Sequence, residues 1–204
     1  MMTKAYNFLF FTIFFAFILT PVYGESALDI NEKDFVIGNE DAKITIIEYA
    51  SLSCSHCADF HTNTLETLKK EYIDTGKVKM VFRDYPFNYP ALLGSMVLRC
   101  IPENYRYDYM NALFKLQPDW VNKKNKKTIQ ELYKIMQSGG MTKDEYDACI
   151  YNTELENEIL KGVMEAQNQF NIKSTPSFII DGKLIEGNKS IKEFRQIIDK
   201  ILSQ

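Results

Sequence analysis

A predicted buried strand that runs directly into a predicted helix is the feature that most restricts the fold of this chain. Residues 42–50, AKITIIEYA, are β-branched and largely apolar, which indicates a central strand covered on both faces. Residues 53–72, SCSHCADFHTNTLETLKKEY, carry apolar or small side chains at steps of three to five residues, as along one face of a helix. Cys54 and Cys57 therefore lie where the strand turns into the helix.

The remaining segments extend this unit into an α/β arrangement. Residues 77–86, KVKMVFRDYP, indicate a second buried strand, and the pattern from about residue 92 to residue 170 is helical. Residues 176–187, PSFIIDGKLIEG, contain two short apolar runs around an Asp181-Gly182 turn and predict a hairpin. An amphipathic helix follows. Because parallel strands need long crossovers, we predict an α/β fold with an all-helical insertion between its two halves.

Helix boundaries within this pattern come from capping signals. Four segments have the Ser/Thr-x-x-Glu spacing of a capping box: Thr128–Glu131, Thr142–Glu145, Thr153–Glu156 and Ser190–Glu193. Gly139–Gly140 is expected to end the first of these helices. The third helix carries an apolar stripe that we interpret as core packing rather than a cofactor site: Leu155, Ile159, Val163, Ala166 and Phe170.

The N-terminus predicts export. Residues 8–19, FLFFTIFFAFIL, form an apolar run of 12 that is short for a membrane span and typical of a signal peptide. We predict a signal peptide over 1–24, cleaved after Gly24; an uncleaved anchor is the alternative. The net charge of −3 gives no basic field, which argues against a nucleic-acid partner, and the basic run at 123–127 is expected to be a solvated loop.

Export changes what the four cysteines can do, because disulfides persist outside the cytosol. Three pairings are possible, and the spacing favours Cys54 with Cys57 and Cys100 with Cys149. We expect the second pair to be a structural disulfide that holds the helical block. Two buried free thiols are the alternative.

The first pair has the position of a reactive site. A thiolate at a helix N-terminus is stabilised by free backbone N–H groups and by the helix dipole, so Cys54 is the expected nucleophile and the inner Cys57 acts second. A protonated His56 would stabilise the Cys54 thiolate further and make the disulfide a stronger oxidant. Two alternatives remain: a bracing disulfide, and a zinc site of Cys54, Cys57 and His61 with His56 as a possible fourth ligand.

The motif CSHC on a strand-to-helix turn, followed about 120 residues later by STPSFIIDG, resembles the DsbA-type branch of the thioredoxin superfamily. The segment EYASLSCSHC is similar to the same family, and the resemblance covers nearly all of residues 30–204. It implies a thioredoxin fold built from residues 25–90 and 151–204, a helical insertion over 91–150, a periplasmic location and disulfide oxidoreductase activity. The dipeptide Ser55-His56 departs from the family's usual Pro-His, which leaves the oxidising strength open.

The resemblance also implies residue roles. Cys54 matches the attacking cysteine, Cys57 the resolving cysteine and His56 the histidine between them. Pro176 matches a cis-proline that faces the disulfide, and the backbone of the preceding Thr175 would pair with an extended substrate strand.

Glu48 matches a buried acid of the family, and it shares its strand face with Ile44 and Ile46. It could accept the proton of Cys57; a core glutamate without a role is the alternative. We expect His61 to be a partly exposed helix residue without a catalytic task.

The function that follows is oxidation of newly exported, cysteine-containing proteins by a monomer that carries no cofactor and no metal. The resemblance implies reoxidation by a DsbB-like, quinone-linked membrane protein. A disulfide isomerase or reductase on the same fold is the first alternative, and a metal-binding thiol module is the second.

Overall fold

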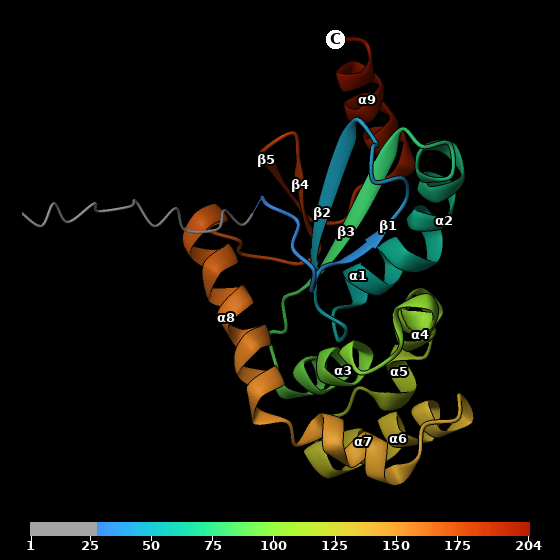
Figure 1. Ribbon diagram of the computed structural model, residues 1–204, viewed down its shortest axis with the longest axis vertical. Coiled ribbons are helices and arrows are strands. Elements are labelled where there is room, and N and C mark those ends of the chain that lie inside the picture. The colour runs from blue at the N-terminus through green and yellow to red at the C-terminus, as the bar shows by residue number, and fades with distance from the viewer. Residues whose placement is uncertain (1–27) are drawn as a thin grey trace, which may run out of the picture.

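The computed structural model describes residues 28–204, which form a five-stranded sheet with a helical block at one end (Figure 1). The strand order is β1-β3-β2-β4-β5. The predicted signal peptide lies outside the described residues. Within residues 28–204, no helix combines the length and the apolar composition that crossing a membrane requires.

The centre of the sheet is the predicted parallel pair. β2 (Ile44–Ala50) and β3 (Val78–Asp84) run side by side in parallel, which confirms both buried strands. β1 (Phe35–Ile37) adds an antiparallel edge to β3. The sequence does not predict β1, because three residues are too few to show a strand period.

The other edge of the sheet is the predicted hairpin. β4 (Ser177–Ile180) pairs antiparallel with β2 and with β5 (Lys183–Glu186). Asp181 and Gly182 both have positive φ, 51° and 70°, as the two central residues of a type I′ turn require. The Asp-Gly signal therefore placed this turn correctly.

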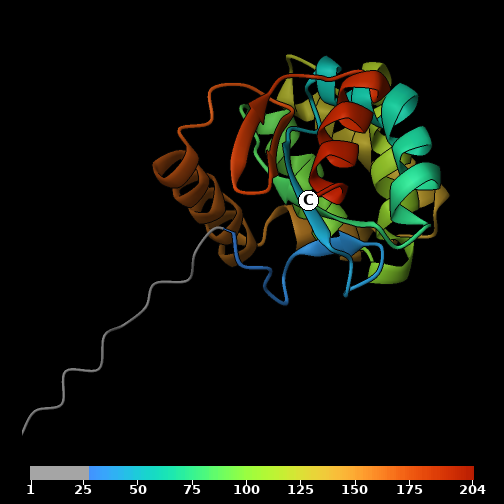
Figure 2. The same ribbon diagram turned by 90° about the horizontal axis from the view of Figure 1, so that it is seen from above.

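Helices cover both faces of the sheet (Figures 1 and 2). The helix after the cysteine motif and α9 (Ile191–Leu202) pack on the face that carries Ile44 and Ile46. The C-terminal half of α8 (Thr153–Phe170) packs on the opposite face. In α8 the predicted apolar stripe is confirmed as core packing.

The helix after the cysteine motif is not a regular α-helix. It is continuous but alternates between two helix types: α1 (Ser55–Asp59), the π-helical η1 (Phe60–Thr64), α2 (Leu65–Leu68) and the π-helical η2 (Lys69–Ile73). A π-turn holds one extra residue, so the buried face shifts along the helix. The predicted five-residue step from Phe60 to Leu65 is this π-turn.

The helical block between the two halves of the sheet consists of five helices: α3 (Tyr89–Arg99), α4 (Glu103–Lys115), α5 (Gln117–Trp120), α6 (Asn125–Ser138) and α7 (Lys143–Ile150). Large apolar side chains from these helices, Trp120 and Tyr146 among them, extend the main core into the block. The structure thus confirms an α/β fold with an inserted helical domain. The boundaries at 90/91 and 150/151 remain a prediction.

The predicted disulfide between Cys100 and Cys149 is present and joins the end of α3 to α7. The two Cα atoms are 6.3 Å apart, and the cysteines are 49 positions apart in sequence. The bond therefore fastens two helices of the block to each other.

Two of the four predicted capping boxes are confirmed. The side chains of Thr142 and Ser190 each accept the backbone N–H of the glutamate three residues later, and that glutamate bonds back to the cap. The predicted helix end is also confirmed, because α6 ends at Ser138 with Gly139 as its C-cap.

The other two boxes are wrong. α6 begins three residues before Thr128, which is buried and whose hydroxyl bonds to the backbone of Asn122. The basic run at 123–127 is exposed as predicted, although part of it belongs to the first turn of α6. α8 is capped by Asn152, whose side chain accepts the Leu155 N–H, so Thr153 is its first helical residue. At α8 the side chain of Asn152 takes the place of the expected cap, whereas α6 starts at Lys124 without a side-chain cap.

Candidate active site

Cys54 and Cys57 occupy unequal positions at the start of the helix. Cys54 is the N-cap of α1 and partly exposed, whereas Cys57 lies one turn inside and is fully buried in the main core. The two sulfurs are not bonded to each other, so the structure describes the reduced pair. The structure therefore confirms the prediction that Cys54 is the more exposed thiol and Cys57 the more buried one.

The two thiols also differ in acidity. The pKa of Cys54 falls to about 5, chiefly because the Cys57 thiol donates a hydrogen bond to its sulfur. The Thr175 side chain and backbone N–H groups of Cys57 and His56 lower the pKa further, while partial burial opposes the shift. Burial raises the pKa of Cys57 well above its usual range, and the negative charge of Glu48 adds to the rise. At neutral pH the site holds one thiolate and one thiol.

His56 lies on the exposed side of this turn. Its backbone N–H contributes to the low pKa of Cys54, but within residues 28–204 its ring forms no hydrogen bond or ion pair. The predicted effect of the His56 imidazole on Cys54 therefore remains a prediction.

The loop before β4 brings Thr175 and Pro176 against Cys54. Their peptide bond is cis, as predicted. The carbonyl oxygen of Thr175 lies 3.3 Å from the Cys54 sulfur and accepts a hydrogen bond from the thiol form. The buried Thr175 hydroxyl has no other partner in the described chain and is available to the thiolate form. Thr175 thus presents both an acceptor and a donor to the reactive sulfur.

Glu48 and His61 form a buried pair behind Cys57. Glu48 is 0% exposed, and both of its carboxylate oxygens lie within 3.2 Å of His61 Nε2. His61 is 6% exposed, so the prediction of a partly exposed residue was wrong. The spacing of four residues from the buried Cys57 indicates the helix face of His61, but the rings that bury it come from β3 and α4.

Comparison with known proteins agrees with this geometry. A family model described as Thioredoxin matches residues 30–200. The chain belongs to the thioredoxin family. The crystal structure of Wolbachia pipientis alpha-DsbA1 is similar with a TM-score of 0.80 and 30% identity, and the match covers 88% of this chain and 96% of that one. The predicted DsbA-type branch is thereby confirmed.

Two sequence relatives point the same way. A putative protein-disulfide oxidoreductase of Rickettsia bellii is 32% identical over 177 residues, which are 86% of this chain and 67% of the relative. Disulfide bond formation protein D of Bacillus subtilis is 25% identical over 82% of this chain and 76% of its own length. The matched region spans about two thirds of the length of the Rickettsia relatives, 62% in Rickettsia felis.

In this DsbA-type chain the helical block reaches the active site through Gln117, which sequence reasoning missed. Gln117 begins α5 and is buried. Its side-chain N–H₂ group donates to the backbone carbonyls of Leu52 at 2.9 Å and Cys54 at 3.0 Å. The block therefore holds the loop that leads into α1. A single glutamine in a helical segment gave no signal of this contact.

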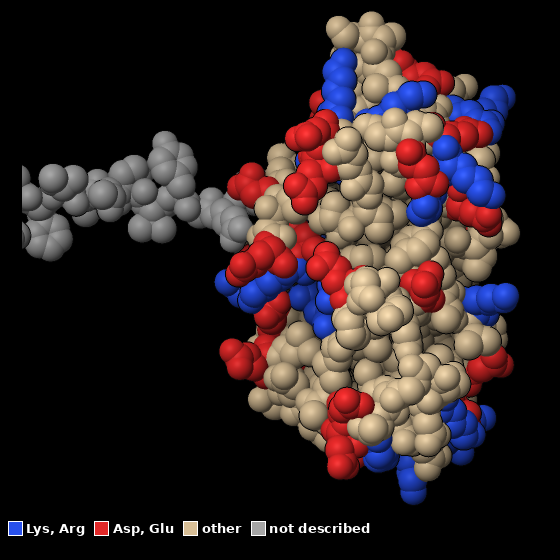
Figure 3. Space-filling view, turned by 45° about the vertical axis from the view of Figure 1, so that its right-hand side comes forward, with Lys and Arg blue, Asp and Glu red and all other residues tan. Residues whose placement is uncertain are grey.

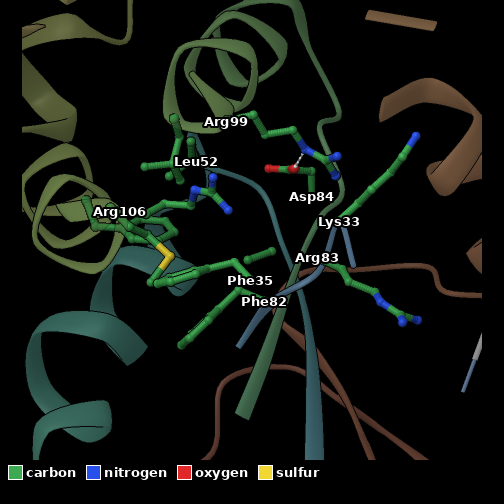
Figure 4. A pocket seen from close by; sticks show the side chains of 12 residues that line it. Lys33, Phe35, Leu52, Phe82, Arg83, Asp84, Arg99 and Arg106 are labelled. Atoms are coloured by element: carbon green, nitrogen blue, oxygen red, sulfur yellow. Dashed lines mark hydrogen bonds and ion pairs between the residues drawn. The ribbon is translucent and has the colours of Figure 1, made fainter. Parts of the chain in front are cut away.

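A cavity lies beside the same loop (Figure 4). Leu52 and three aromatic rings, Phe35, Phe82 and Phe114, line its apolar side. Its polar side includes Arg106 and an ion pair in which Arg99 Nε lies 2.7 Å from Asp84 Oδ2. Neither Cys54 nor Cys57 lines this cavity, so it is separate from the exchange site.

The geometry does not support the zinc alternative. In the described part of the chain, no three His, Cys, Asp or Glu side chains come together as a metal site. His61, one of the suggested ligands, uses its Nε2 on Glu48. The thiols are placed for exchange with another sulfur.

Proposed function

We propose that this chain is a periplasmic thiol:disulfide oxidoreductase that introduces disulfides into exported proteins through Cys54 and Cys57. The observation that carries the proposal is the unequal placement of the two thiols. Cys54 is partly exposed at the N-cap of α1 beside the Thr175 carbonyl, and Cys57 is buried one turn inside, so the pKa of Cys54 falls to about 5 and that of Cys57 rises. A stable thiolate is a good leaving group. It also favours the reduced state, which makes the disulfide a strong oxidant.

The reaction proceeds in two exchanges. A substrate thiolate attacks Cys54 of the closed disulfide, forms a mixed disulfide with it and releases Cys57 as a thiolate that takes up a proton. A second substrate thiolate then attacks the substrate sulfur, so that the substrate disulfide forms and Cys54 leaves as its stable thiolate. The substrate loses two electrons, and the cysteine pair gains them.

The location and the partners belong to the same proposal. A signal peptide over 1–24 would deliver the chain to the periplasm, where its substrates would be newly exported, cysteine-containing proteins. A DsbB-like membrane protein would reoxidise the monomer. The surface in Figure 3 intermixes acidic and basic groups with uncharged areas, which suits substrates of varied sequence.

The redox potential of Cys54–Cys57 tests the oxidase against the reductase or isomerase. Equilibration with glutathione should give a value nearer the about −120 mV of DsbA than the about −270 mV of thioredoxin. A value at the thioredoxin end would favour the reductase. Failure of the wild-type protein to oxidise a dithiol peptide would refute the proposal.

Trapping experiments test the residue roles. Cys57→Ala should accumulate mixed disulfides through Cys54, because the second thiol that resolves them is gone. Cys54→Ala should accumulate few, because Cys57 is buried. Comparable trapping by both variants on non-reducing gels would contradict the assignment.

A further inference from the structure

Among the described residues, the Glu48 carboxylate has a single side-chain hydrogen-bonding partner, His61. In the sheet, Glu48 is flanked by Phe82 on β3 and Phe178 on β4. Within residues 28–204, its side-chain hydrogen bonds all go to His61 Nε2. A buried carboxylate without compensation is costly, so His61 is what makes an acid tolerable at this position.

The imidazole is held in turn by aromatic rings. It stacks on Phe114 of α4, with ring centroids 4.1 Å apart, and also contacts Phe60 and Phe82. In the part of the chain that the structure describes, His61 Nδ1 is buried without a hydrogen-bond partner. In this apolar place, an Nδ1 atom without a proton is less costly than an Nδ1–H group without an acceptor. The neutral ring therefore carries its proton on Nε2 and donates a hydrogen bond from it to Glu48.

The reaction needs a proton at this place. When a substrate opens the disulfide, Cys57 is released as a thiolate in the core, where burial disfavours charge. Cys57 and His61 are both buried and lie one turn apart on the helix that packs against the strand face of Glu48. The negative charge of Glu48 also raises the pKa of Cys57. The pair is thus the titratable unit that the departing thiolate meets.

We propose that His61 is the positioning residue that aims Glu48 at Cys57 through its Nε2–H, so that Glu48 supplies and later recovers the Cys57 proton. In the oxidised enzyme the pair holds one additional proton. Opening of the disulfide passes that proton to the Cys57 sulfur and leaves Glu48 as a carboxylate. Reoxidation returns it from Cys57 to Glu48. The inference rests on the proposed exchange at Cys54 and Cys57 and adds His61 to it.

Three variants of the full-length protein separate positioning from packing. His61→Gln places an N–H near the position of Nε2, His61→Asn is too short to reach it, and His61→Phe keeps a ring against Phe114. The measurement is the rate constant for opening of the Cys54–Cys57 disulfide by reduced glutathione at pH 7. We expect His61→Asn and His61→Phe to lose at least about tenfold, and His61→Gln to stay within about threefold of wild type.

A double-mutant cycle supplies the second arm. If His61 acts through Glu48, His61→Phe should cause no further loss in a Glu48→Gln background. The Cys54 titration midpoint should stay near 5 in the single His61 variants, because its causes lie in Cys57, Thr175 and the backbone. If His61→Phe fails to fold, the comparison of His61→Gln with His61→Asn carries the test.

Equal rates in His61→Gln and His61→Asn, or a full His61→Phe loss in the Glu48→Gln background, would overturn the inference. Those outcomes leave the oxidase intact if the wild-type protein oxidises a dithiol peptide. Failure of the wild-type protein in that assay would instead remove the proposed function.

Discussion

The two cysteine pairs of this chain lie at opposite ends of helices. Cys54 is the N-cap of α1, where free N–H groups and the positive end of the helix dipole favour a thiolate. Cys100 is the C-cap of α3, and Cys149 lies in the last turn of α7. At a helix C-terminus the dipole and the free carbonyls disfavour a thiolate.

This difference shows how one small protein can hold two cysteine pairs with different tasks. Exchange needs a thiolate that can attack and leave. The pair at the N-terminus of α1 supplies one, whereas the pair in the helical block has neither that end charge nor a neighbouring third thiol. We therefore infer that Cys54–Cys57 exchanges electrons and that Cys100–Cys149 is a static cross-link.

The largest expected effect separates the two pairs directly. Cys54→Ser should reduce oxidation of a dithiol peptide to the background rate, because no other exposed thiolate remains. Cys100→Ala/Cys149→Ala should keep the wild-type rate. Peptide oxidation followed by mass spectrometry measures both, and substantial activity in Cys54→Ser would mean that the second pair also exchanges.

The second prediction concerns stability, to which we expect the Cys100–Cys149 pair to contribute more than the Cys54–Cys57 pair. Loss of the Cys100–Cys149 bond frees a loop of about 50 residues, worth at most about 4 kcal/mol by chain entropy. At roughly 2–4 °C per kcal/mol, Cys100→Ala/Cys149→Ala should melt about 10 °C lower. Thermal unfolding measures this, with the Cys54 titration as the control. An unchanged melting temperature would contradict a stabilising cross-link.

The two central strands and the turns around the reactive pair were predicted correctly from the sequence, because their signals are local. β-branched runs identified β2 and β3, and the turn chemistry of Asp181-Gly182 fixed the hairpin. The N-cap position of Cys54 followed from the strand-to-helix junction. Each of these signals lies within a few consecutive residues.

What the sequence did not predict depends on contacts between distant segments. The burial of His61 depends on a π-turn and on rings from β3 and α4. The Gln117 contact joins residues 63 and 65 positions apart. At Thr128 and Thr153, a correct spacing motif was overridden by other backbone geometry at the helix start. Periodicity and spacing describe single elements and do not contain such contacts.

The third prediction follows from the depressed pKa of Cys54. The pKa of about 5 in the folded protein lies below the usual cysteine value of 9.0, so the thiolate stabilises the folded reduced protein. This contribution is complete above pH 9, declines as the pH falls toward 5 and is lost below it. The oxidised protein has no such group. The stability of the reduced form relative to the oxidised form should therefore rise from pH 5 to pH 9, and denaturant unfolding of both forms measures it.

The same titration can be observed directly. Ultraviolet absorbance of the reduced protein should show a thiolate that disappears with a midpoint near pH 5. The Cys54→Ser variant is the control and should show no such transition. A midpoint near 9 would remove the electrostatic difference between the two pairs.

The fourth prediction tests whether the helical block influences the reactive pair. Gln117→Met keeps the length of the side chain but removes both donors to the Leu52 and Cys54 carbonyls. The Leu52 carbonyl loses this donor, whereas the Cys54 carbonyl keeps the backbone N–H of Ala58, so the change should cost about 1–3 kcal/mol and loosen the loop before α1. Denaturant unfolding measures the loss. Gln137→Met, at an exposed position of α6, is the matched control and should change little.

The smallest expected effect concerns the side chains around the Cys54 sulfur. Thr175→Val removes the buried hydroxyl that lowers the pKa of Cys54 and preserves the shape of the side chain. Because Cys57 remains the largest cause, the pKa should rise by less than about one unit. His56→Leu should raise it less still, since the exposed ring is removed and the backbone N–H stays. A larger rise in His56→Leu than in Thr175→Val would mean that the imidazole of His56 contributes more than the hydroxyl of Thr175 to the low pKa of Cys54.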